Sequence, residues 1–546
     1  MARLNNVAYD VAIVGFGPSG AVAAALLGQV GLRVLVVDKS TSVYDKPRAV
    51  AMDHEIMRVL QGIGVADAVL PHTEPFSASE HFGADGQLIR RLTMLPPPYP
   101  MGWTPSMVFC QPPVEQILRE RVAALPSVNV QLGTELVALS QDVDGASLQL
   151  QTGQESPRTV RASYVIGCDG ASSTVRRLVG IELEDLDFDE PWLVVDVLAN
   201  AQGLAKLPHA SAQFCEPARP VSFLIGTGNH RRWEIMLLPG EDARTMEQEA
   251  EVWKLLARWI TPEDGVLWRR ASYRFHALVA KTWHSGRVFI AGDAAHQQPP
   301  FLGQGMCQGV RDVANLAWKL QQVITGKLTS DKASAALLDT YGQERCAHVR
   351  QLTATIKGIG RYICERDPAA ARARDAGLIA QVGGTVKSQP RQDLIPGLQV
   401  GLLSDLAQPP HTRHSAVGTL FPQPRVLRDG QPVLLDDVFA AGSVASSDAG
   451  AGWRVVLGDG AQGWQVPTSN VFALVRVRSQ PQSGAWTETE GVLATWFQRH
   501  ACAAAIVRPD HYVYAVAATE TALNAEVVAA KAKFAWIHPN TPLRHS

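Results

Sequence analysis

The sequence predicts an α/β fold of several domains, the first of which begins with a strand–turn–helix–strand unit. Three observations predict it. An apolar run at residues 10–14 precedes a glycine-rich turn, residues 181–284 are rich in strand-like alternation, and new α/β material begins near residue 426. A chain of 546 residues is also too long for a single hydrophobic core.

The first unit is complete in the sequence. Residues 10–14 (Asp-Val-Ala-Ile-Val) have the composition of a buried strand, and the turn Gly15-Phe-Gly-Pro-Ser-Gly20 follows at once. Residues 21–30 form a helix of small side chains, and a second strand at 33–37 ends at Asp38. This context distinguishes a dinucleotide-binding unit from an ordinary glycine turn.

Each glycine of the turn has a separate physical role. Gly15 permits the tight turn, Gly17 lets the backbone approach a pyrophosphate, and Gly20 lets the helix pack close to the strand. The helix N-terminus then offers N–H donors to the phosphates. Asp38 lies where a carboxylate accepts hydrogen bonds from ribose hydroxyls, and we place Lys39 beside it in the same site.

A second glycine pattern, at residues 458–463, lacks this context. The segment after it, Trp-Gln-Val-Pro-Thr-Ser, contains a proline and β-branched residues, so we expect a loop between strands. One dinucleotide fold is therefore predicted, and a nicotinamide cofactor has none of its own.

Composition excludes several classes of protein. The net charge of −2 gives no electrostatic footprint for nucleic acid, and no apolar run reaches the ~20 residues of a membrane span. The first ten residues lack the pattern of a signal peptide. Seven scattered cysteines without a Cys-x-x-Cys pair argue against disulfides, a zinc site or a dithiol centre. We expect a cytoplasmic protein.

Successive segments of the chain are expected to alternate between a nucleotide-binding domain and a β-rich domain. Residues 96–100 form a proline-rich loop, a long helix is expected at 309–323 with helical pattern to about 360, and the next stretch is rich in Arg, Pro and Gly. We assign residues 1–75, 101–180 and 285–365 to a discontinuous nucleotide-binding domain, 76–100 and 181–284 to a β-rich domain that encloses a substrate, 366–425 to a connector, and 426–546 to a C-terminal domain.

Two further motifs complete a family pattern. Asp169-Gly170 leads to Arg176, and Gly292-Asp-Ala-Ala-His296 leads into residues 299–306. With the glycine turn and Asn315–Leu320, they resemble the class A flavoprotein aromatic hydroxylases, which have the p-hydroxybenzoate hydroxylase fold. The resemblance covers residues 10 to 320 and implies FAD held in a Rossmann-type domain with an inserted substrate domain.

Other stretches resemble one group within that class. Residues 47–50, 189–192 and 232–234 resemble the 3-(3-hydroxyphenyl)propionate hydroxylases, and residues 418–424 and 508–510 resemble their C-terminal domain. That domain has a thioredoxin-like fold. Because the cysteine pair of thioredoxin is absent here, we expect a structural or dimer-supporting role and a possible homodimer.

The resemblance assigns residues to the flavin. Asp293 follows a strand and can bind the ribityl hydroxyls of FAD. Pro300, Gly303, Gly305 and Met306 place small residues and backbone N–H groups beside the ring, where they favour negative charge on its reduced form. Three more residues are assigned to FAD by resemblance: Arg48, Gln111 and Asp169, the last also toward the passing nicotinamide.

Residues for substrate chemistry are harder to assign. Asp53 and His54 are candidates for a base, although Asp53 also begins an apparent helix and we favour it as the N-cap. For His296, in the flavin motif, we favour a packing or hydrogen-bonding role. Arg219 and Arg232 are candidates for binding an acidic substrate, although we favour a structural or solvated role for each.

The implied reaction is a hydroxylation. In this class NAD(P)H reduces FAD when an aromatic substrate is bound, and O₂ then gives a flavin C4a-hydroperoxide that hydroxylates the ring in a dry chamber. We expect a phenolic acid such as 3-(3-hydroxyphenyl)propionate as substrate, and expect the Trp-containing middle sheet to enclose the chamber. Resorcinol-like, hydroxypyridine or polyketide substrates and a non-catalytic flavin-binding regulator remain alternatives.

Overall fold

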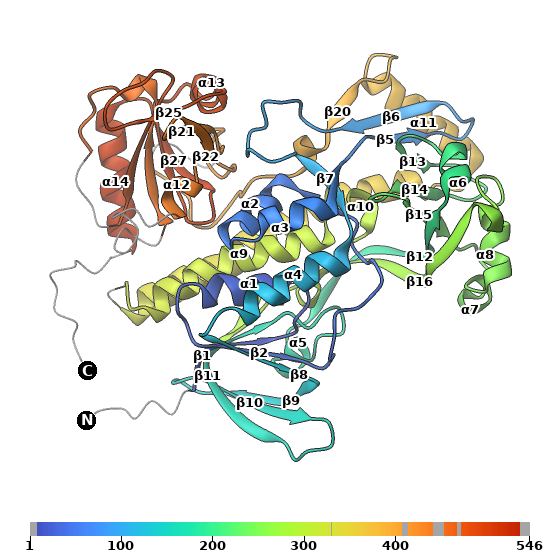
Figure 1. The fold of residues 1–546 in the computed structure, drawn as a ribbon, viewed down its shortest axis with the longest axis horizontal. Coiled ribbons are helices and arrows are strands. Elements are labelled where there is room, and N and C mark those ends of the chain that lie inside the picture. Colours follow the sequence, from blue (N-terminus) through green and yellow to red (C-terminus); the bar gives the residue numbers. More distant parts are fainter. Residues whose placement is uncertain (1–7, 329, 407–412, 441–451, 467–470, 535–546) are drawn as a thin grey trace.

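A computed structural model describes residues 8–328, 330–406, 413–440, 452–466 and 471–534 (Figure 1). These residues form two large sheets, a smaller sheet in the C-terminal part, and two long helices between them, α9 (Gly305–Ile324) and α10 (Asp331–Ile363). No helix in the described ranges has the length and apolar character needed to cross a membrane.

The first sheet has the predicted Rossmann-type arrangement. Its order is β17-β18-β11-β1-β2-β8, and from β18 to β8 all neighbours are parallel. The antiparallel strands β10 and β9 extend from β11. The strands are β1 (Tyr9–Val14), β2 (Val34–Asp38), β8 (Val128–Leu132), β9 (Thr134–Gln141), β10 (Ala146–Thr152), β11 (Arg158–Gly167), β17 (His284–Ser285) and β18 (Val288–Ile290).

Helices of small and apolar residues pack beside this sheet. In α1 (Pro18–Gly28) eight of eleven residues are buried, and the helix lies against α9 (Gly305–Ile324) and α4 (Gln111–Ala123) (Figure 1). Its alanines allow this close approach. Both α1 and α9 begin earlier than the apolar pattern suggested, because Pro18 occupies the first turn of α1 and a glycine opens α9.

The second sheet is mostly antiparallel and has the order β19-β16-β12-β15-β14-β13-β5-β6-β20. Two long strands, β12 (Leu183–Ala199) and β16 (Gly265–Ala280), form its centre. The others are β5 (Ser79–Phe82), β6 (Leu88–Thr93), β13 (Ser211–Phe214), β14 (Val221–Ile225), β15 (His230–Met236), β19 (His296–Gln297) and β20 (Ser388–Pro390).

The segment expected to be a connector forms regular structure. It contains α11 (Pro368–Gln381) and β20, which joins the second sheet in parallel with β6 (Figure 1). Asp375 explains part of this order: it is buried on α11, and its Oδ2 accepts hydrogen bonds from Ala84 N–H and Gln87 Nε2 beside β6. Such contacts between distant residues leave no local sequence pattern.

Shorter elements connect the sheets. The three-stranded sheet β3-β7-β4 consists of β3 (Ala51–Asp53), β7 (Ser106–Phe109) and β4 (Thr73–Pro75). The remaining α-helices before the C-terminal part are α2 (His54–Gly62), α3 (Ala66–Val69), α5 (Thr174–Leu178), α6 (Ala201–Lys206), α7 (Ala243–Met246), α8 (Glu249–Leu256) and α10 (Asp331–Ile363).

The C-terminal part contains a sheet of its own, in the order β25-β24-β23-β26-β27. The glycine pattern at 458–463 lies in a 3₁₀ turn after β23, and the described residues directly after it, 464–466, are not helical, which confirms the expected loop. The elements are β21 (Arg425–Arg428), β22 (Gln431–Leu434), α12 (Asp437–Ala440), β23 (Arg454–Leu457), β24 (Ala473–Arg478), β25 (Trp486–Thr487), α13 (Val492–Arg499), β26 (Ala504–Val507), β27 (Val513–Ala517) and α14 (Glu520–Phe534).

A buried contact joins this part to the long helices. Trp318 of α9 and Trp453 are both buried, and their rings meet edge to face at 5.9 Å. Beside them Arg508 donates to Glu344 of α10 through Nη1 (2.9 Å) and Nη2 (2.7 Å). The C-terminal part therefore packs on the nucleotide-binding part through apolar and charged groups together.

Candidate active site

The glycine turn after β1 is set by contacts at two of its three glycines. A Cβ on Gly15, whose φ is +102°, would lie 2.3 Å from the Cys168 carbonyl oxygen at the end of β11. A Cβ on Gly20 would lie 2.0 Å from the Gly15 carbonyl oxygen. A Cβ on Gly17 would meet no atom within 4 Å. The turn thus packs tightly against the protein at Gly15 and Gly20, whereas the backbone at Gly17 has free space beside it.

Gly17 opens into a cavity of about 410 Å³ between the first and second sheets, a size typical of ligand sites. On the nucleotide-binding side the predicted residues Arg48, Gln111 and Asp293 line it. The loop before α9 contributes Pro300, Gly303, Gly305 and Met306, and the second sheet contributes Arg232. Segments far apart in the sequence therefore meet at one cavity.

Asp293 is an unsatisfied acceptor in this cavity. It lies in a 3₁₀ turn, Gly292–Ala294, directly after β18, and its side chain is exposed to the cavity. No hydrogen bond from another described residue reaches its carboxylate. The protein around it raises its pKa by desolvation, against the charges of His296 and Arg48. A ligand rich in hydroxyl groups would satisfy this carboxylate.

The loop before α9 leads to a helix start whose backbone donors no side chain caps. Gly303 has a left-handed φ of +59°, and a Cβ there would lie 2.9 Å from the Cβ of Ala51. No side chain caps the N-terminus of α9, and a Cβ on Gly305 would meet nothing within 4 Å. The first N–H groups of a helix carry partial positive charge, so this edge of the cavity favours an anionic group.

Gln111 holds the neighbouring segment in place. Its Oε1 accepts a hydrogen bond from Ala49 N–H at 2.7 Å, and its Nε2 donates to Glu115. Arg48, next to Ala49, keeps about half of its side chain exposed, with its Nη2 3.9 Å from Glu115. Its guanidinium is therefore free to turn toward a ligand.

The predicted cofactor residues Asp38, Lys39 and Asp169 are not among the residues that line the cavity. Asp38 accepts hydrogen bonds from Phe16 N–H (2.6 Å) and Ser40 N–H (2.7 Å), which fixes the glycine turn, and Lys39 beside it is exposed. Asp169 accepts from the Ser173 hydroxyl and from two N–H groups at the start of α5. In this structure Asp38 and Asp169 thus hold the glycine turn and the start of α5 in place and do not line the cavity.

The structure does not bring the two candidate bases to this cavity. Asp53 caps α2, as favoured above, by accepting from two N–H groups, and it pairs with Arg311 at 2.5 Å. His54 is buried, and burial lowers its pKa to about 4. Both residues line a separate, smaller cavity beside Tyr512.

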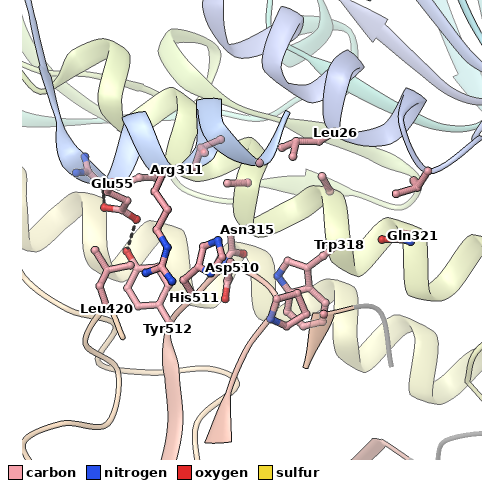
Figure 2. Close-up of a pocket in the computed structure, with 18 of the residues that line it drawn as sticks. Leu26, Glu55, Arg311, Asn315, Trp318, Gln321, Leu420, Asp510, His511 and Tyr512 are labelled. Carbon is pink, nitrogen blue, oxygen red and sulfur yellow. Dashed lines mark hydrogen bonds and ion pairs between the residues drawn. The ribbon is translucent and has the colours of Figure 1, made fainter. Parts of the chain in front are cut away.

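Arg311 is the centre of a network that reaches the C-terminal part (Figure 2). It donates to Glu55 at 2.5 Å and to Gln304, between the cavity-lining Gly303 and Gly305, at 2.8 Å. On the other side the Tyr512 hydroxyl donates to Glu55 at 3.0 Å. Tyr512 of the C-terminal part therefore contacts Glu55, and Glu55 is joined through Arg311 to Gln304 in the loop before α9.

Two other predicted side chains have structural partners. His296 is buried, with its Nε2 2.8 Å from Asp312 and its ring stacked on Trp283, which confirms the packing and hydrogen-bonding role. Arg219 pairs with Glu241 at 2.5 Å and donates to the Met236 carbonyl oxygen. Arg219 is not among the residues that line the cavity.

The second sheet supplies a charged wall. Arg232 is buried, pairs with Asp196 at 2.6 Å, and donates to the carbonyl oxygens of Pro47 and Arg48. Arg269 on β16 also bonds the Pro47 carbonyl oxygen. These arginines fasten the segment that carries Arg48 to the second sheet, and they line the cavity at the same time.

The comparisons with known proteins agree with this geometry. Residues 8–355 match the family model described as "FAD binding domain", and residues 418–532 match "HcaD C-terminal domain". The chain belongs to the class A FAD-dependent aromatic hydroxylases.

Relatives of this hydroxylase extend over almost its whole length. It is 37% identical over 540 residues to a probable NADH-specific resorcinol 4-hydroxylase of Rhodococcus jostii, covering 96% of both chains. It is 35% identical over 531 residues to a 3-(3-hydroxy-phenyl)propionate/3-hydroxycinnamic acid hydroxylase of Mycolicibacterium gilvum, covering 94% of this chain and 90% of the relative.

Solved structures share the fold of the hydroxylase. The flavin-dependent monooxygenase PieE, in complex with FAD and substrate, aligns with a TM-score of 0.78 at 21% identity, over 96% of this chain and 99% of that one. Aklavinone-11 hydroxylase, with FAD and aklavinone, aligns with a TM-score of 0.74 at 23% identity, over 97% of this chain and all of that one.

The residues of the hydroxylase fit FAD. The open Gly17, the unsatisfied Asp293 carboxylate and the uncapped start of α9 offer contacts for a pyrophosphate, a polyol and an electron-rich ring, respectively. Bound FAD, reduced by NAD(P)H, supplies the oxygen chemistry of the reaction. The described residues contain no cluster of metal ligands.

Several cavity residues were not predicted. Glu234, Arg269, Tyr273 and Gln298 all line the cavity. The alternation Arg232-Trp-Glu234 on one strand contained a signal for Glu234, because it places two charged side chains on one face and a tryptophan on the other. Trp233 accordingly lies in the opposite core. The Trp-containing sheet does line the cavity, but with charged and apolar side chains such as Glu234, Arg269 and Phe275 and with none of its tryptophans.

Proposed function

We propose that this hydroxylase acts on a phenol that carries a second substituent at the meta position. The two relatives are named for resorcinol and for 3-(3-hydroxyphenyl)propionate, which share that pattern. The observation that carries the proposal is the single cavity in which the flavin-side loops face the buried polar wall of the second sheet. Met306 from the loop side and Glu234 from the second sheet both line this cavity.

The charge pairing of the wall favours a neutral substituent, such as the second hydroxyl of resorcinol. A substrate carboxylate would need an arginine with free donors. Arg232 and Arg269 are engaged by Asp196, Pro47 and other groups, and Arg274 is paired with Asp189. An acidic side chain would have to compete with these partners or reach Arg48.

For the cofactor, we propose that Gly15, Gly17 and Gly20 form the pyrophosphate turn, with Asp38 and Lys39 toward the ribose. Asp293 would bind the ribityl chain, while Pro300, Gly303, Gly305 and Met306 border the ring. Arg48, Gln111 and Asp169 would complete the site. The open and unsatisfied groups described above support these roles. The relative named as NADH-specific favours NADH as reductant.

For the domains, we propose the division given by the sequence, with residues 426–546 forming a thioredoxin-like C-terminal domain. A five-stranded mixed sheet flanked by α13 and α14 supports this assignment. All seven cysteines are free and no pair of them is close in sequence, so the domain has no dithiol chemistry. We assign it a structural role, and a homodimer stays a prediction.

A substrate screen tests the function. The purified FAD-bound protein is mixed with NADH and, in turn, resorcinol, 3-(3-hydroxyphenyl)propionate and unsubstituted phenol, while NADH loss, peroxide and product are measured. We expect resorcinol to accelerate NADH oxidation most and its product to carry one oxygen atom from ¹⁸O₂. Greater product formation with the propionate would refute the neutral substituent. Tight FAD binding without acceleration by any phenol would identify a regulator instead.

A further inference from the structure

Glu234 is a buried acid, and neither a salt bridge nor a hydrogen bond to another described residue explains its position. It lies on β15, only 4% of its surface is exposed, and it lines the active-site cavity. No hydrogen bond from another described residue reaches its carboxylate. A buried carboxylate without donors is costly, so a position like this one calls for an explanation in function.

The groups around Glu234 define its electrostatic setting. Arg232 lies two residues earlier on the same strand, Asp196 is on β12, and Arg269 and Tyr273 are on β16. Each of these residues except Asp196 lines the same cavity, as does Arg48 on the facing segment. Burial raises the pKa of Glu234 to about 7, against the opposing effect of the Arg232 charge. The carboxyl therefore gains and loses its proton near neutral pH.

We propose that Glu234 is the base that accepts the hydroxyl proton of the bound phenol. This inference rests on the proposed function. The O–H bond of the phenol breaks, its electron pair stays on the oxygen, and the proton forms a new O–H bond on the Glu234 carboxylate. The phenolate produced is a more electron-rich ring for oxygen transfer.

The charge balance of the wall favours this transfer. Arg232 and Arg269 bring two positive charges, and Asp196, within 3.7 Å of both, balances one of them. The second is balanced by Glu234 before the transfer and by the phenolate after it. Since the negative charge only moves within the reach of the same arginines, the step creates no unpaired charge in a buried place.

Proton counting in the resting FAD-bound enzyme tests the proposal without turnover. Resorcinol is added at pH 8, without NADH and without O₂, and the absorbance of phenolate is recorded together with the protons released to buffer. We expect a phenolate band and no net release, because the negative charge of the phenolate beside Glu234 raises the pKa of its carboxyl further, so that Glu234 keeps the proton at pH 8. A phenolate band with one proton released per site, or no phenolate band at all, would overturn the proposal.

Variants then assign the effect to this residue. Glu234→Gln should move ionisation of the bound phenol up toward that of free phenol, near pH 10, and lower the hydroxylation rate by about 10²–10⁴-fold. In the wild type the hydroxylation rate should rise as the pH passes 7, because Glu234 then loses its proton. This rise should be absent in Glu234→Gln. Glu234→Asp should restore part of both, and a more acidic, fluorinated resorcinol should rescue Glu234→Gln.

The matched control is Glu241→Gln, which removes a glutamate that pairs with Arg219 and does not line the cavity. It should leave the phenolate band and the pH profile unchanged. If Glu234→Gln keeps the wild-type band and profile while binding FAD normally, Glu234 is not the base. If no phenol binds or reacts in the wild type, the proposed function fails before this inference is reached.

Discussion

The contact between Arg508 and Glu344 gives the most quantitative prediction for stability. The Glu344 carboxylate is fully buried and accepts from Arg508, from Lys319 at 2.8 Å and from Asn315 at 2.7 Å. Burial alone would raise its pKa, but Arg508 and Lys319 outweigh burial and hold it well below its usual range. Arg508 also donates to Asp510 at 2.9 and 2.7 Å.

Arg508→Met would leave two buried carboxylates with one buried lysine. Removing one partner of a buried pair costs about 3–5 kcal/mol, because the remaining charge is neither paired nor hydrated. We expect this loss in the urea transition of the C-terminal part. Tryptophan fluorescence measures this transition, because Trp318 and Trp453 pack against each other between α9 and the C-terminal part and separate when the C-terminal part unfolds.

The control is Arg372→Met, an identical substitution in a surface pair with Asp85. There the arginine side chain is 61% exposed and its Nε lies 3.1 Å from the aspartate, so the expected change is about 0–1 kcal/mol. Equal shifts in the two variants would refute the argument that burial, rather than ion pairing as such, gives the contact its strength.

Three further substitutions test the flavin site and its support. Gly20→Ala places a methyl group 2.0 Å from the Gly15 carbonyl oxygen, and we expect the protein to be isolated without FAD; normal FAD content would contradict the close turn. Asp293→Asn should weaken FAD binding about 10–100-fold, as expected for loss of charged hydrogen bonds worth ~1.5–3 kcal/mol, measured by fluorescence titration of the apoprotein. Tyr512→Phe removes the donor to Glu55 and should destabilise the protein by about 1.5–3 kcal/mol in urea, with an unchanged midpoint refuting the contact.

Features with a local cause were predictable from the sequence. The strand–turn–helix unit, the N-cap at Asp53 and the loop at 458–463 each depend on residues within a few positions of one another. The glycines are informative for the same reason, since a turn that excludes a Cβ permits no other residue. Family motifs singled out Asp293, Pro300, Gly303, Gly305 and Met306, and these residues line one cavity.

Features that depend on distant partners were not predictable in this way. Asp38 and Asp169 carry the expected carboxylates, but backbone N–H groups of the glycine turn and of α5 engage them, and only the folded chain shows that. Arg232 lines the cavity, yet Asp196 and two carbonyl oxygens occupy its donors. A sequence gives the type of a side chain, whereas the donors and acceptors that this side chain keeps free for a ligand depend on its neighbours in the folded protein.

Helix α9 connects the two regions for which these arguments were made. Its uncapped N-terminus borders the cavity, its first turns carry Arg311 toward Gln304 and Glu55, and its later turns carry Lys319 and Trp318 to the C-terminal part (Figure 1). Because a continuous helix moves as a rigid rod, docking of the C-terminal part restrains the same element that borders the flavin. These contacts are the physical basis for the structural role proposed for the C-terminal part, which contacts the helix that borders the cavity without lining the cavity itself.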